Sequence, residues 1–518
     1  MKHLALRHTS EVVPSDLRES RRAHLPNPRA LRVLVAAALV ATSLSVIVFA
    51  VLSASGDRAI VANIGPSGPF ADLNHTLPLG LVRLGCWFAA ISGGAGVLAG
   101  LAAVRYGWRP PVGHVLMACA VATVLLVFVP PAASVDVQNY AEYGRIVVLG
   151  HNPYVMTPEQ LYRLRDPVGL LRPGPWQDQP TVYGPAATAE EAAAAWLGGT
   201  SMAWIIFWIK VVNGACYVAI AVLLGRLAGS DPARRARTAV LWAVNPLMLF
   251  WMVAGAHADL LAVLPLVLAL WVLRAVWRRQ AERWLAWAAA IAGALAGIAI
   301  AVKVTFGAPV VGLAATLWRG NFGQRRMTLL ASGAAGGVVV LAAGYLIVGR
   351  AAFTSLSQRL SSANDSFLPM PGSVYDHAAL YTAISLATLL LVGGLLAWRM
   401  PPGDGDLPEI KPILVCALAV VLGGMVQYPW YDAMFFPLLA LLPASRLDAW
   451  LTTRIVLISC VVLPGIGIKT DQYRDARVLV PAFMVAFLLA LAAGKVFARS
   501  GQLQAAVPGP PSAGRLGA

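Results

Sequence analysis

The chain has 518 residues, of which 58% are hydrophobic and only 12% are charged. Because soluble domains carry about 25% charged residues, this composition excludes a soluble enzyme, a secreted disulfide domain and a disordered protein, and it indicates a polytopic membrane protein. The 40 Lys and Arg residues outnumber the 24 Asp and Glu residues, an excess that we assign to the cytoplasmic face of a membrane rather than to nucleic-acid binding.

Apolar segments follow one another along most of the chain. A basic segment at residues 1–32 is expected to be a disordered cytoplasmic tail. About 14 apolar runs come after it, at residues 33–55, 79–104, 113–133, 203–225, 238–256, 260–277, 284–302, 304–318, 328–348, 378–398, 412–427, 433–445, 453–468 and 478–497. The sequence therefore predicts an all-α bundle of about 14 transmembrane helices, one domain over residues 33–497, and a second cytoplasmic tail at residues 498–518.

The distribution of positive charge predicts how these spans are oriented. With both termini on the cytoplasmic side, most of the 40 Lys and Arg residues fall in cytoplasmic segments, as the positive-inside rule requires. This orientation puts two long loops, at residues 134–202 and 349–377, outside the plasma membrane. In the first loop we expect an amphipathic helix near residues 157–172 and an alanine-rich helix near residues 187–198.

The cysteines do not indicate a disulfide or a metal site. All five lie in apolar stretches, with neither a CxxC pair nor a Cys/His metal spacing: Cys86, Cys119, Cys216, Cys416 and Cys460. We expect them to be small buried hydrophobic residues.

The start of the first long loop carries a carboxylate with aromatic neighbours. Asp136 lies at the outer end of a span, and Tyr140 and Tyr143 follow four and seven residues later. On a helix these three side chains share one face. The pattern suits sugar binding, because a carboxylate accepts a hydroxyl proton and aromatic rings pack on the C–H groups of a sugar. The alternative is a helix cap with tyrosines in the interfacial belt.

Two tripeptides in the same loop read as turns. They are Asn152-Pro153-Tyr154 and Tyr183-Gly184-Pro185, and their Pro and Gly residues are typical of chain reversals. Each either shapes the loop alone or also contributes polar groups to a site.

Polar residues interrupt several apolar spans, where an unpaired charge is costly. They are Asn245, followed by Pro246; His257 and Asp259 in one tight turn; Lys303; and Trp430, Tyr431 and Asp432 in another turn. In the predicted topology both turns and Lys303 lie on the same outer side as Asp136, so we expect them to converge there. The alternatives are an ordinary turn residue for His257 and a Lys303 side chain that reaches the lipid headgroups.

Further polar residues lie in the other outer loops. Arg359, in the second long loop, either binds a phosphate or is a solvated loop charge. Asp57, Asp72 and His75, in the first outer loop, form an alternative catalytic set. We rank this set below Asp136 because no aromatic cluster lies near it in the sequence.

Taken in order, these motifs resemble those of a known family. The set consists of Asp136-x3-Tyr140-x2-Tyr143, Asn152-Pro153-Tyr154, Tyr183-Gly184-Pro185, Asn245-Pro246, His257-x-Asp259, Lys303 and Pro429-Trp430-Tyr431. It is similar to the set found in actinobacterial polyprenyl-phosphomannose-dependent alpha-1,6-mannosyltransferases, which belong to the GT-C membrane glycosyltransferases. The resemblance implies a hexosyltransferase that moves mannose from polyprenyl-phosphate mannose to a growing alpha-1,6-mannan of the lipomannan type. The transfer would occur on the outer face of the plasma membrane, with inversion at the sugar carbon.

The resemblance also implies roles for individual residues. An Asp at the outer end of an early span is the general base of GT-C enzymes, and here that residue is Asp136. We expect the substrates to be bound by Tyr140, Tyr143, Asn152, Tyr154, Tyr183, Asn245, His257, Asp259, Lys303, Arg359, Trp430 and Tyr431. We expect neither a cofactor nor a metal, because the lipid-linked sugar is itself a substrate and Lys303 supplies positive charge for its phosphate.

Two other functions remain open from the sequence alone. A transferase of the same fold could use polyprenyl-phosphate arabinose or another sugar. Broken spans with polar residues are also typical of a transporter or of a flippase for lipid-linked sugars. The long loop with a carboxylate at its start, and the lack of an evident inverted repeat, favour the enzyme.

Overall fold

The computed structural model describes most of the chain. It covers residues 28–56, 59–66, 68–73, 75, 77–171, 176–278, 284–319, 325–354, 378–401, 410–424, 427–464 and 473–497. Within these ranges the regular elements are helices, apart from one isolated bridge between Val61 and Ala132. Arg359, Asp57 and the larger part of both predicted tails lie outside the described residues.

Fourteen helical segments correspond to the predicted apolar runs. Among the described residues, six are long and apolar enough to cross a membrane: α2 (Pro28–Ala54), α3 (Leu79–Arg105), α8 (Met202–Leu227), the segment Pro232–Ala254, α12 (Leu285–Val302) and α14 (Arg325–Val348). The other runs form α4 (Val112–Val127), α11 (Asp259–Arg278), α13 (Gly307–Arg319), α17 (Ala378–Arg399), α18 (Ile410–Gly423), α19 (Phe436–Leu441), α20 (Leu447–Val462) and α21 (Tyr473–Ala492). The all-α prediction is confirmed for this part of the chain, and the number of spans stays a prediction.

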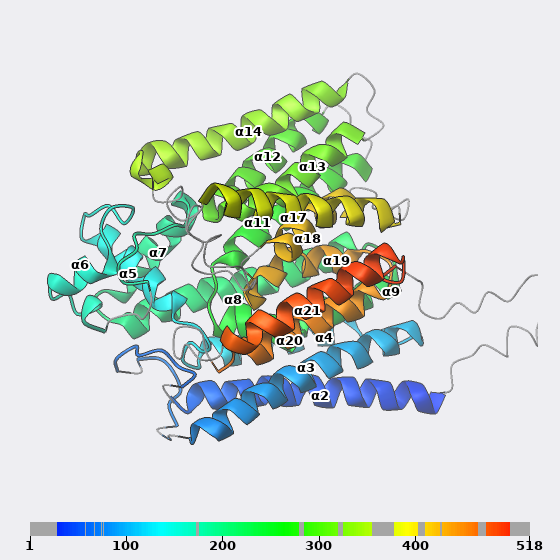
Figure 1. The fold of residues 1–518 in the computed structure, drawn as a ribbon, viewed down its shortest axis with the longest axis horizontal. Coiled ribbons are helices and arrows are strands. Elements are labelled where there is room, and N and C mark those ends of the chain that lie inside the picture. The colour runs from blue at the N-terminus through cyan, green and yellow to red at the C-terminus, as the bar shows by residue number, and fades with distance from the viewer. Residues whose placement is uncertain are drawn as a thin grey trace, which may run out of the picture.

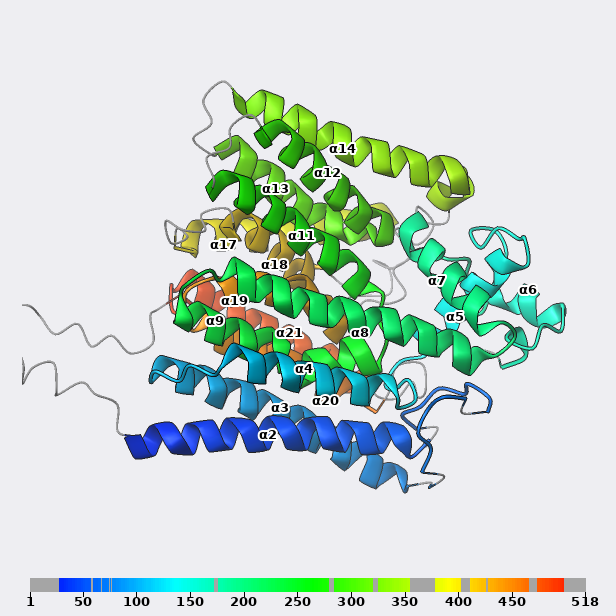
Figure 2. The same ribbon diagram turned by 180° about the vertical axis from the view of Figure 1, so that it is seen from behind.

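The helices lie side by side with roughly parallel axes (Figure 1, Figure 2). The helices α2 and α3 cover one side of the bundle, and α12, α13 and α14 cover the opposite side. Glycine allows the close approach of α12 and α14, since a Cβ atom on Gly293 would lie 1.8 Å from the carbonyl oxygen of Gly333. Small residues at such crossings are typical of helix pairs in membranes.

The segment Pro232–Ala254 is not one regular helix. It is divided into α9 (Pro232–Thr238), η2 (Ala239–Ala243), α10 (Pro246–Leu249) and η3 (Phe250–Ala254). Pro246 has no N–H to continue a helix, and the side chain of Asn245 caps the new one by accepting from the backbone N–H groups of Leu247 and Met248, at 3.1 and 3.4 Å. Asn245 therefore has the helix-cap role that its position before proline allows.

Three helices gather beyond one end of the bundle. They are α5 (Asp136–Val148), α6 (Pro158–Arg163) and α7 (Pro185–Gly198) (Figure 1). The alanine-rich helix predicted near residues 187–198 corresponds to α7. The single amphipathic helix predicted near residues 157–172 is wrong, because the chain there forms α6 and a separate short helix, η1 (Gly169–Leu171). Arg165 has a φ of 57° between the two, a left-handed conformation that ends the first helix.

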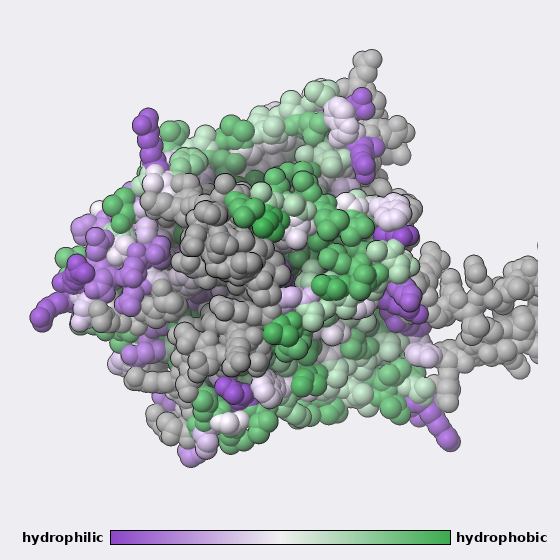
Figure 3. Space-filling model, viewed as in Figure 1, coloured by the Kyte–Doolittle hydropathy of each residue, from purple (hydrophilic) through white to green (hydrophobic). Residues whose placement is uncertain are grey.

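The opposite end of the bundle is held by a buried ion pair. Arg237, in α9, donates to both carboxylate oxygens of Asp448, in α20, at 2.6 and 3.0 Å. The same guanidinium donates to the backbone carbonyl of Leu439, in α19, at 3.1 Å. Between the two ends, hydrophobic residues dominate the face shown in Figure 3, whereas hydrophilic residues gather over α5 and α6. This distribution is the one that a helical bundle in a bilayer requires.

Candidate active site

The helix α5, at the end of the bundle where α5, α6 and α7 gather, positions Asp136 and Tyr140. Asp136 is the first residue of α5, and its backbone N–H donates to Ser134 Oγ at 3.1 Å. The chain reaches this helix through Ala133, whose φ of 72° lies in the left-handed region. Tyr140 follows one turn later, and its hydroxyl lies 3.0 Å from that of Tyr183, in the turn before α7. The helical face predicted for Asp136 and Tyr140 is present.

Two turns that are distant in the sequence meet Asp136. His257 Nδ1 lies 3.9 Å from Asp136 Oδ2, and the His257 ring stacks on Trp430 with 3.9 Å between ring centroids. Lys303 Nζ lies 3.0 Å from both carboxylate oxygens of Asp259. We call this group the Asp136 cluster; its members are Asp136, Tyr140, Tyr183, His257, Asp259, Lys303, Trp430 and Tyr431.

The cation of the cluster is held on two sides. Lys303 ends α12, and its extended backbone (φ −151°, ψ 120°) separates α12 from η5 (Val304–Phe306). Its ammonium group lies 4.1 Å from the centroid of the Tyr431 ring, while Asp259 takes two of its hydrogen bonds. A lysine has three N–H donors, so Asp259 leaves one of them for another acceptor. Lys303 is therefore held in place while one of its three N–H groups is not taken by Asp259.

Close packing fixes the position of His257. The residue before it, Ala256, has a φ of 56°, and such conformations persist only where the surrounding structure enforces them. A Cβ atom on Gly255 would lie 3.1 Å from His257 Cδ2 and 2.7 Å from the carbonyl oxygen of Trp251. Glycine at position 255 therefore lets the imidazole sit against Trp430.

The turn that carries Trp430 is anchored from α20. Residues Pro429–Met434 form the short helix η6, and Asp432 within it is paired with Arg454. The same guanidinium donates to Gln427 Oε1 at 2.6 Å. All three side chains are buried. Asp432, which the predicted topology also placed on the outer side, thus binds Arg454 rather than facing Asp136 directly.

Burial and neighbouring charge shape the protonation of the cluster. Burial raises the pKa of Asp136 to about 6, although the positive charge of Lys303 and hydrogen bonds with Trp176 and Ser134 act to lower it. Burial, reinforced by the charge of Lys303, lowers the pKa of His257 well below its ordinary value. At neutral pH these shifts leave a carboxylate at position 136 beside a neutral imidazole.

This arrangement supplies the groups that a transfer reaction needs. Asp136 is a carboxylate with a raised pKa, which suits a proton acceptor. Lys303 offers positive charge to an anion, and the partly buried Tyr183 offers an aromatic surface. Across the described ranges, no three His, Cys, Asp or Glu side chains lie close enough together to hold a metal ion.

Four predicted binding residues lie outside the cluster. The Tyr143 hydroxyl donates to the carbonyl of Gln179 at 2.9 Å, and the Tyr154 hydroxyl lies 2.9 Å from Thr188 Oγ1. Asn152 shapes its own turn, because its Oδ1 accepts from the backbone N–H of Tyr154 at 2.9 Å. Asn245 is the buried helix cap described above. These contacts hold all four in place; Asn152 and Tyr154 also line a pocket beside α7, and Arg359 lies outside the described residues.

Two residues near the site were missed from the sequence. Trp176 hydrogen-bonds Asp136, but it lies 40 residues further along the chain, in a proline-rich stretch that indicates only a loop. Arg454 anchors Asp432, but it lies 22 residues further along the chain, in another apolar segment. A buried Asp three residues after a Pro in an apolar segment was the available signal, because such a carboxylate requires a cation.

Comparisons with known proteins identify the family of the chain. A family profile described as "Alpha-(1->6)-mannopyranosyltransferase, N-terminal domain" matches residues 32–320. A probable alpha-(1->6)-mannopyranosyltransferase of Mycolicibacterium smegmatis is 30% identical over 168 residues, which are 31% of this chain and 28% of the relative. The chain thus matches less than a third of that relative's length. No solved structure matches significantly. Because the family profile covers more than half of its residues, the chain belongs to the alpha-(1→6)-mannopyranosyltransferase family.

Proposed function

We propose that the protein transfers mannose from polyprenyl-phosphate mannose to an alpha-1,6-mannan acceptor of the lipomannan type, on the outer face of the plasma membrane. The family supports a mannosyltransferase, and the apolar helices support a membrane location. The orientation is supported by α5–α7 lying at the end of the bundle opposite to α9, whose sequence PARRART contains three arginines.

One observation carries the proposal: a partly buried carboxylate, Asp136, lies beside the Lys303–Asp259 pair. The carboxylate comes from α5, the aspartate of the pair from α11 and the lysine from the end of α12. An ammonium group near a carboxylate with a pKa of about 6 gives a proton acceptor and an anion site in one place. Glycosyl transfer from a lipid phosphate needs these two elements together.

The proposed reaction is a single displacement. The acceptor hydroxyl oxygen forms a bond to C1 of mannose while the bond from C1 to the phosphate oxygen breaks. Asp136 accepts the proton of the hydroxyl, and the polyprenyl phosphate leaves with the bonding electron pair. A beta-linked donor then gives an alpha-linked product, because the attack inverts C1.

The two basic side chains have different tasks in this scheme. Lys303 stabilises the negative charge that develops on the departing phosphate. His257 is neutral because its pKa is lowered, so it lies 3.9 Å from Asp136 as an uncharged ring rather than as a positive charge. Tyr140 and Tyr183, whose hydroxyls face each other, contact the sugars.

A direct transfer assay tests the proposal. Purified protein in detergent is incubated with radiolabelled polyprenyl-phosphate mannose and a short alpha-1,6-mannan acceptor, and the product linkage is determined. Parallel reactions use polyprenyl-phosphate arabinose and a nucleotide-activated mannose. We expect a new alpha-1,6 linkage from the lipid-linked mannose alone. Transfer from the nucleotide sugar, or no transfer from the lipid-linked mannose, would contradict the proposal.

A further inference from the structure

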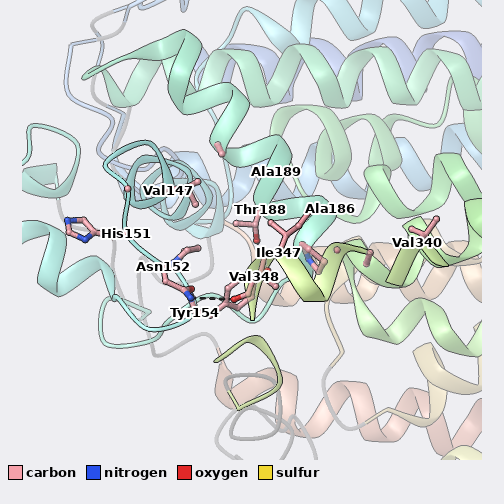
Figure 4. A pocket seen from close by; sticks show the side chains of 16 residues that line it. Val147, His151, Asn152, Tyr154, Ala186, Thr188, Ala189, Val340, Ile347 and Val348 are labelled. Atoms are coloured by element: carbon pink, nitrogen blue, oxygen red, sulfur yellow. Dashed lines mark hydrogen bonds between the residues drawn. The ribbon is translucent and has the colours of Figure 1, made fainter. Parts of the chain in front are cut away.

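A second feature lies next to the Asp136 cluster. A pocket of about 570 Å³ is formed between α7 and the outer end of α14 (Figure 4). This volume is within the range of roughly 300–1,000 Å³ that is typical of small-molecule sites. Its walls are mostly apolar, and they include Ala186 and Ala189 of α7 together with Val340, Ile347 and Val348 of α14.

The pocket and the Asp136 cluster are built from the same two segments of the backbone. Pro185 and Ala301 line the pocket, and each lies two residues from a member of the cluster, Tyr183 and Lys303 respectively. The two segments are joined where the backbone N–H of Gly184 donates to the carbonyl of Val302 at 3.0 Å. A Cβ atom on Gly184 would lie 2.2 Å from the Ala301 carbonyl oxygen. The wall of the pocket and the cation of the cluster therefore belong to one packed unit.

The pocket also lies at the surface that faces lipid. The helix α14 is one of the segments long enough to cross a membrane, and the pocket is lined by its last turns. Ile347 is 85% exposed and the neighbouring Leu346 is 82% exposed. Large apolar side chains with this exposure belong in contact with acyl chains rather than water. A molecule dissolved in the bilayer can therefore reach the pocket from the side.

We propose that this pocket holds the first part of the isoprenoid chain of a lipid-phosphate sugar donor. The proposal rests on the proposed function and names the part of the chain that recognises the lipid. In such a donor the apolar chain is joined directly to the phosphate, so an apolar pocket adjoining Lys303 fits it. In a glycan acceptor, sugar residues separate the reacting hydroxyl from any lipid anchor, so its chain would not adjoin the cation.

Filling the pocket tests the assignment. Ala189 is exposed and lines the pocket, whereas Ala193, one turn further along α7, is equally exposed and lies outside its lining. We expect Ala189→Trp to raise KM for a long-chain donor about tenfold, as expected when roughly two methylene groups lose their burial. KM for a donor with a very short isoprenoid chain, and for the acceptor, should change little. Ala193→Trp should resemble the wild type.

A charge on the other wall gives a second test. We expect Ile347→Asp to raise KM for the long-chain donor, because an apolar chain bound in the pocket would remove the carboxylate from water at a cost in free energy. Leu346→Asp places the same charge one residue away, outside the lining, and should have the smaller effect. Equal effects of the two variants would overturn the assignment.

A binding measurement separates this assignment from the proposed function. Long-chain polyprenyl phosphate without a sugar should raise the thermal midpoint of the wild type and of Ala193→Trp, but raise that of Ala189→Trp much less. The same rise in all three proteins would overturn the pocket assignment even if transfer is observed. If the rise follows the pocket but no mannose is transferred, the assignment stands and the proposed function fails. A raised KM for the acceptor alone would show an acceptor lipid in the pocket and overturn the assignment.

Discussion

The two ends of the bundle use the same kinds of charged residues in different ways. At the end away from α5, Arg237 and Asp448 form two direct hydrogen bonds at 2.6 and 3.0 Å. In the Asp136 cluster, His257 Nδ1 is 3.9 Å from Asp136, and neither ring nitrogen of His257 has a hydrogen-bond partner among the described residues. We infer that Arg237 and Asp448, which bind each other directly, serve the fold, whereas the imidazole of His257 beside Asp136 is available for chemistry.

Structural and functional titratable groups in this protein differ in their partners rather than in their burial. Asp448 and His257 are both almost completely buried. Asp448 also accepts from the backbone N–H of Ser445 at 3.3 Å, in addition to Arg237. The imidazole, in contrast, is held by ring stacking and steric contact. The following predictions test the distinction from both sides, from the largest expected effect to the smallest.

The largest loss of stability is expected at the structural pair. Arg237→Met leaves Asp448 buried without its cation, which costs about 3–5 kcal/mol of folding free energy. The measurement is the thermal midpoint in detergent, compared with Arg235→Met, in which the lost arginine is exposed. Arg237→Met should fall far below the control, while the transfer rate per folded molecule stays close to that of the wild type. Equal midpoints would show that the pair is not structural.

Removing the cation of the cluster should lower the transfer rate per folded molecule, in addition to any loss of stability from leaving Asp259 without its partner. Lys303→Met removes the charge that stabilises the leaving phosphate, and we expect the transfer rate to fall about 10²–10³-fold. The matched control is Lys411→Met, because Lys411 donates to the backbone carbonyl of Met400 at another helix end. Unimpaired transfer by Lys303→Met would remove Lys303 from the reaction.

The contact between α7 and α12 gives an intermediate effect. In Gly184→Ala the new Cβ atom would lie 2.2 Å from the Ala301 carbonyl oxygen, so the helices must separate, at a cost of about 1–3 kcal/mol. Both the thermal midpoint and the transfer rate should fall, since Tyr183 and Lys303 are attached to this contact. Gly225→Ala is the control because nothing lies within 4 Å of its added Cβ. A normal Gly184→Ala variant would contradict the close approach.

The smallest effect concerns pH. A base must be unprotonated, so kcat/KM should fall below pH 6 as Asp136, with a pKa of about 6, takes up a proton. Trp176→Phe removes a hydrogen bond that lowers this pKa, and should therefore move the midpoint of the acid limb to higher pH. Trp196→Phe, which alters a tryptophan that is 74% exposed, should leave it unchanged. If the midpoint of the acid limb does not move in Trp176→Phe, the limb reports the titration of a group other than Asp136.

Local patterns were sufficient to predict much of the site. The spacing of Asp136 and Tyr140 placed them on one helical face, and the alternation of spans brought His257, Asp259 and Lys303 to the side of Asp136. Both results depend only on helix geometry and on how often the chain crosses the bundle. The same reasoning placed Tyr143 in the site, although its hydroxyl binds the Gln179 carbonyl. Periodicity gives the direction of a side chain but not the partner that it meets.

Other features depend on contacts between distant segments and were not predictable. The Arg454–Asp432 pair, the Trp176 hydrogen bond and the pocket between α7 and α14 each require the packed structure. The region near residues 157–172 was predicted as one helix because its leucines are suitably spaced, but the side chain of Asp166 accepts from the backbone N–H of Val168 at 3.0 Å. This local hydrogen bond competes with helix formation and starts a new turn.

The most direct test of the account compares two carboxyl groups on α5, of which Asp136 is partly buried and Glu142 is fully buried. Asp136→Asn should fold with the thermal midpoint of the wild type yet transfer mannose from polyprenyl-phosphate mannose at least about 100-fold more slowly. Glu142→Gln alters a side chain on the same helix that is 0% exposed and outside the Asp136 cluster, and should retain nearly full activity. Wild-type rates for Asp136→Asn, or equal losses in both variants, would contradict the role of Asp136 as the proton acceptor.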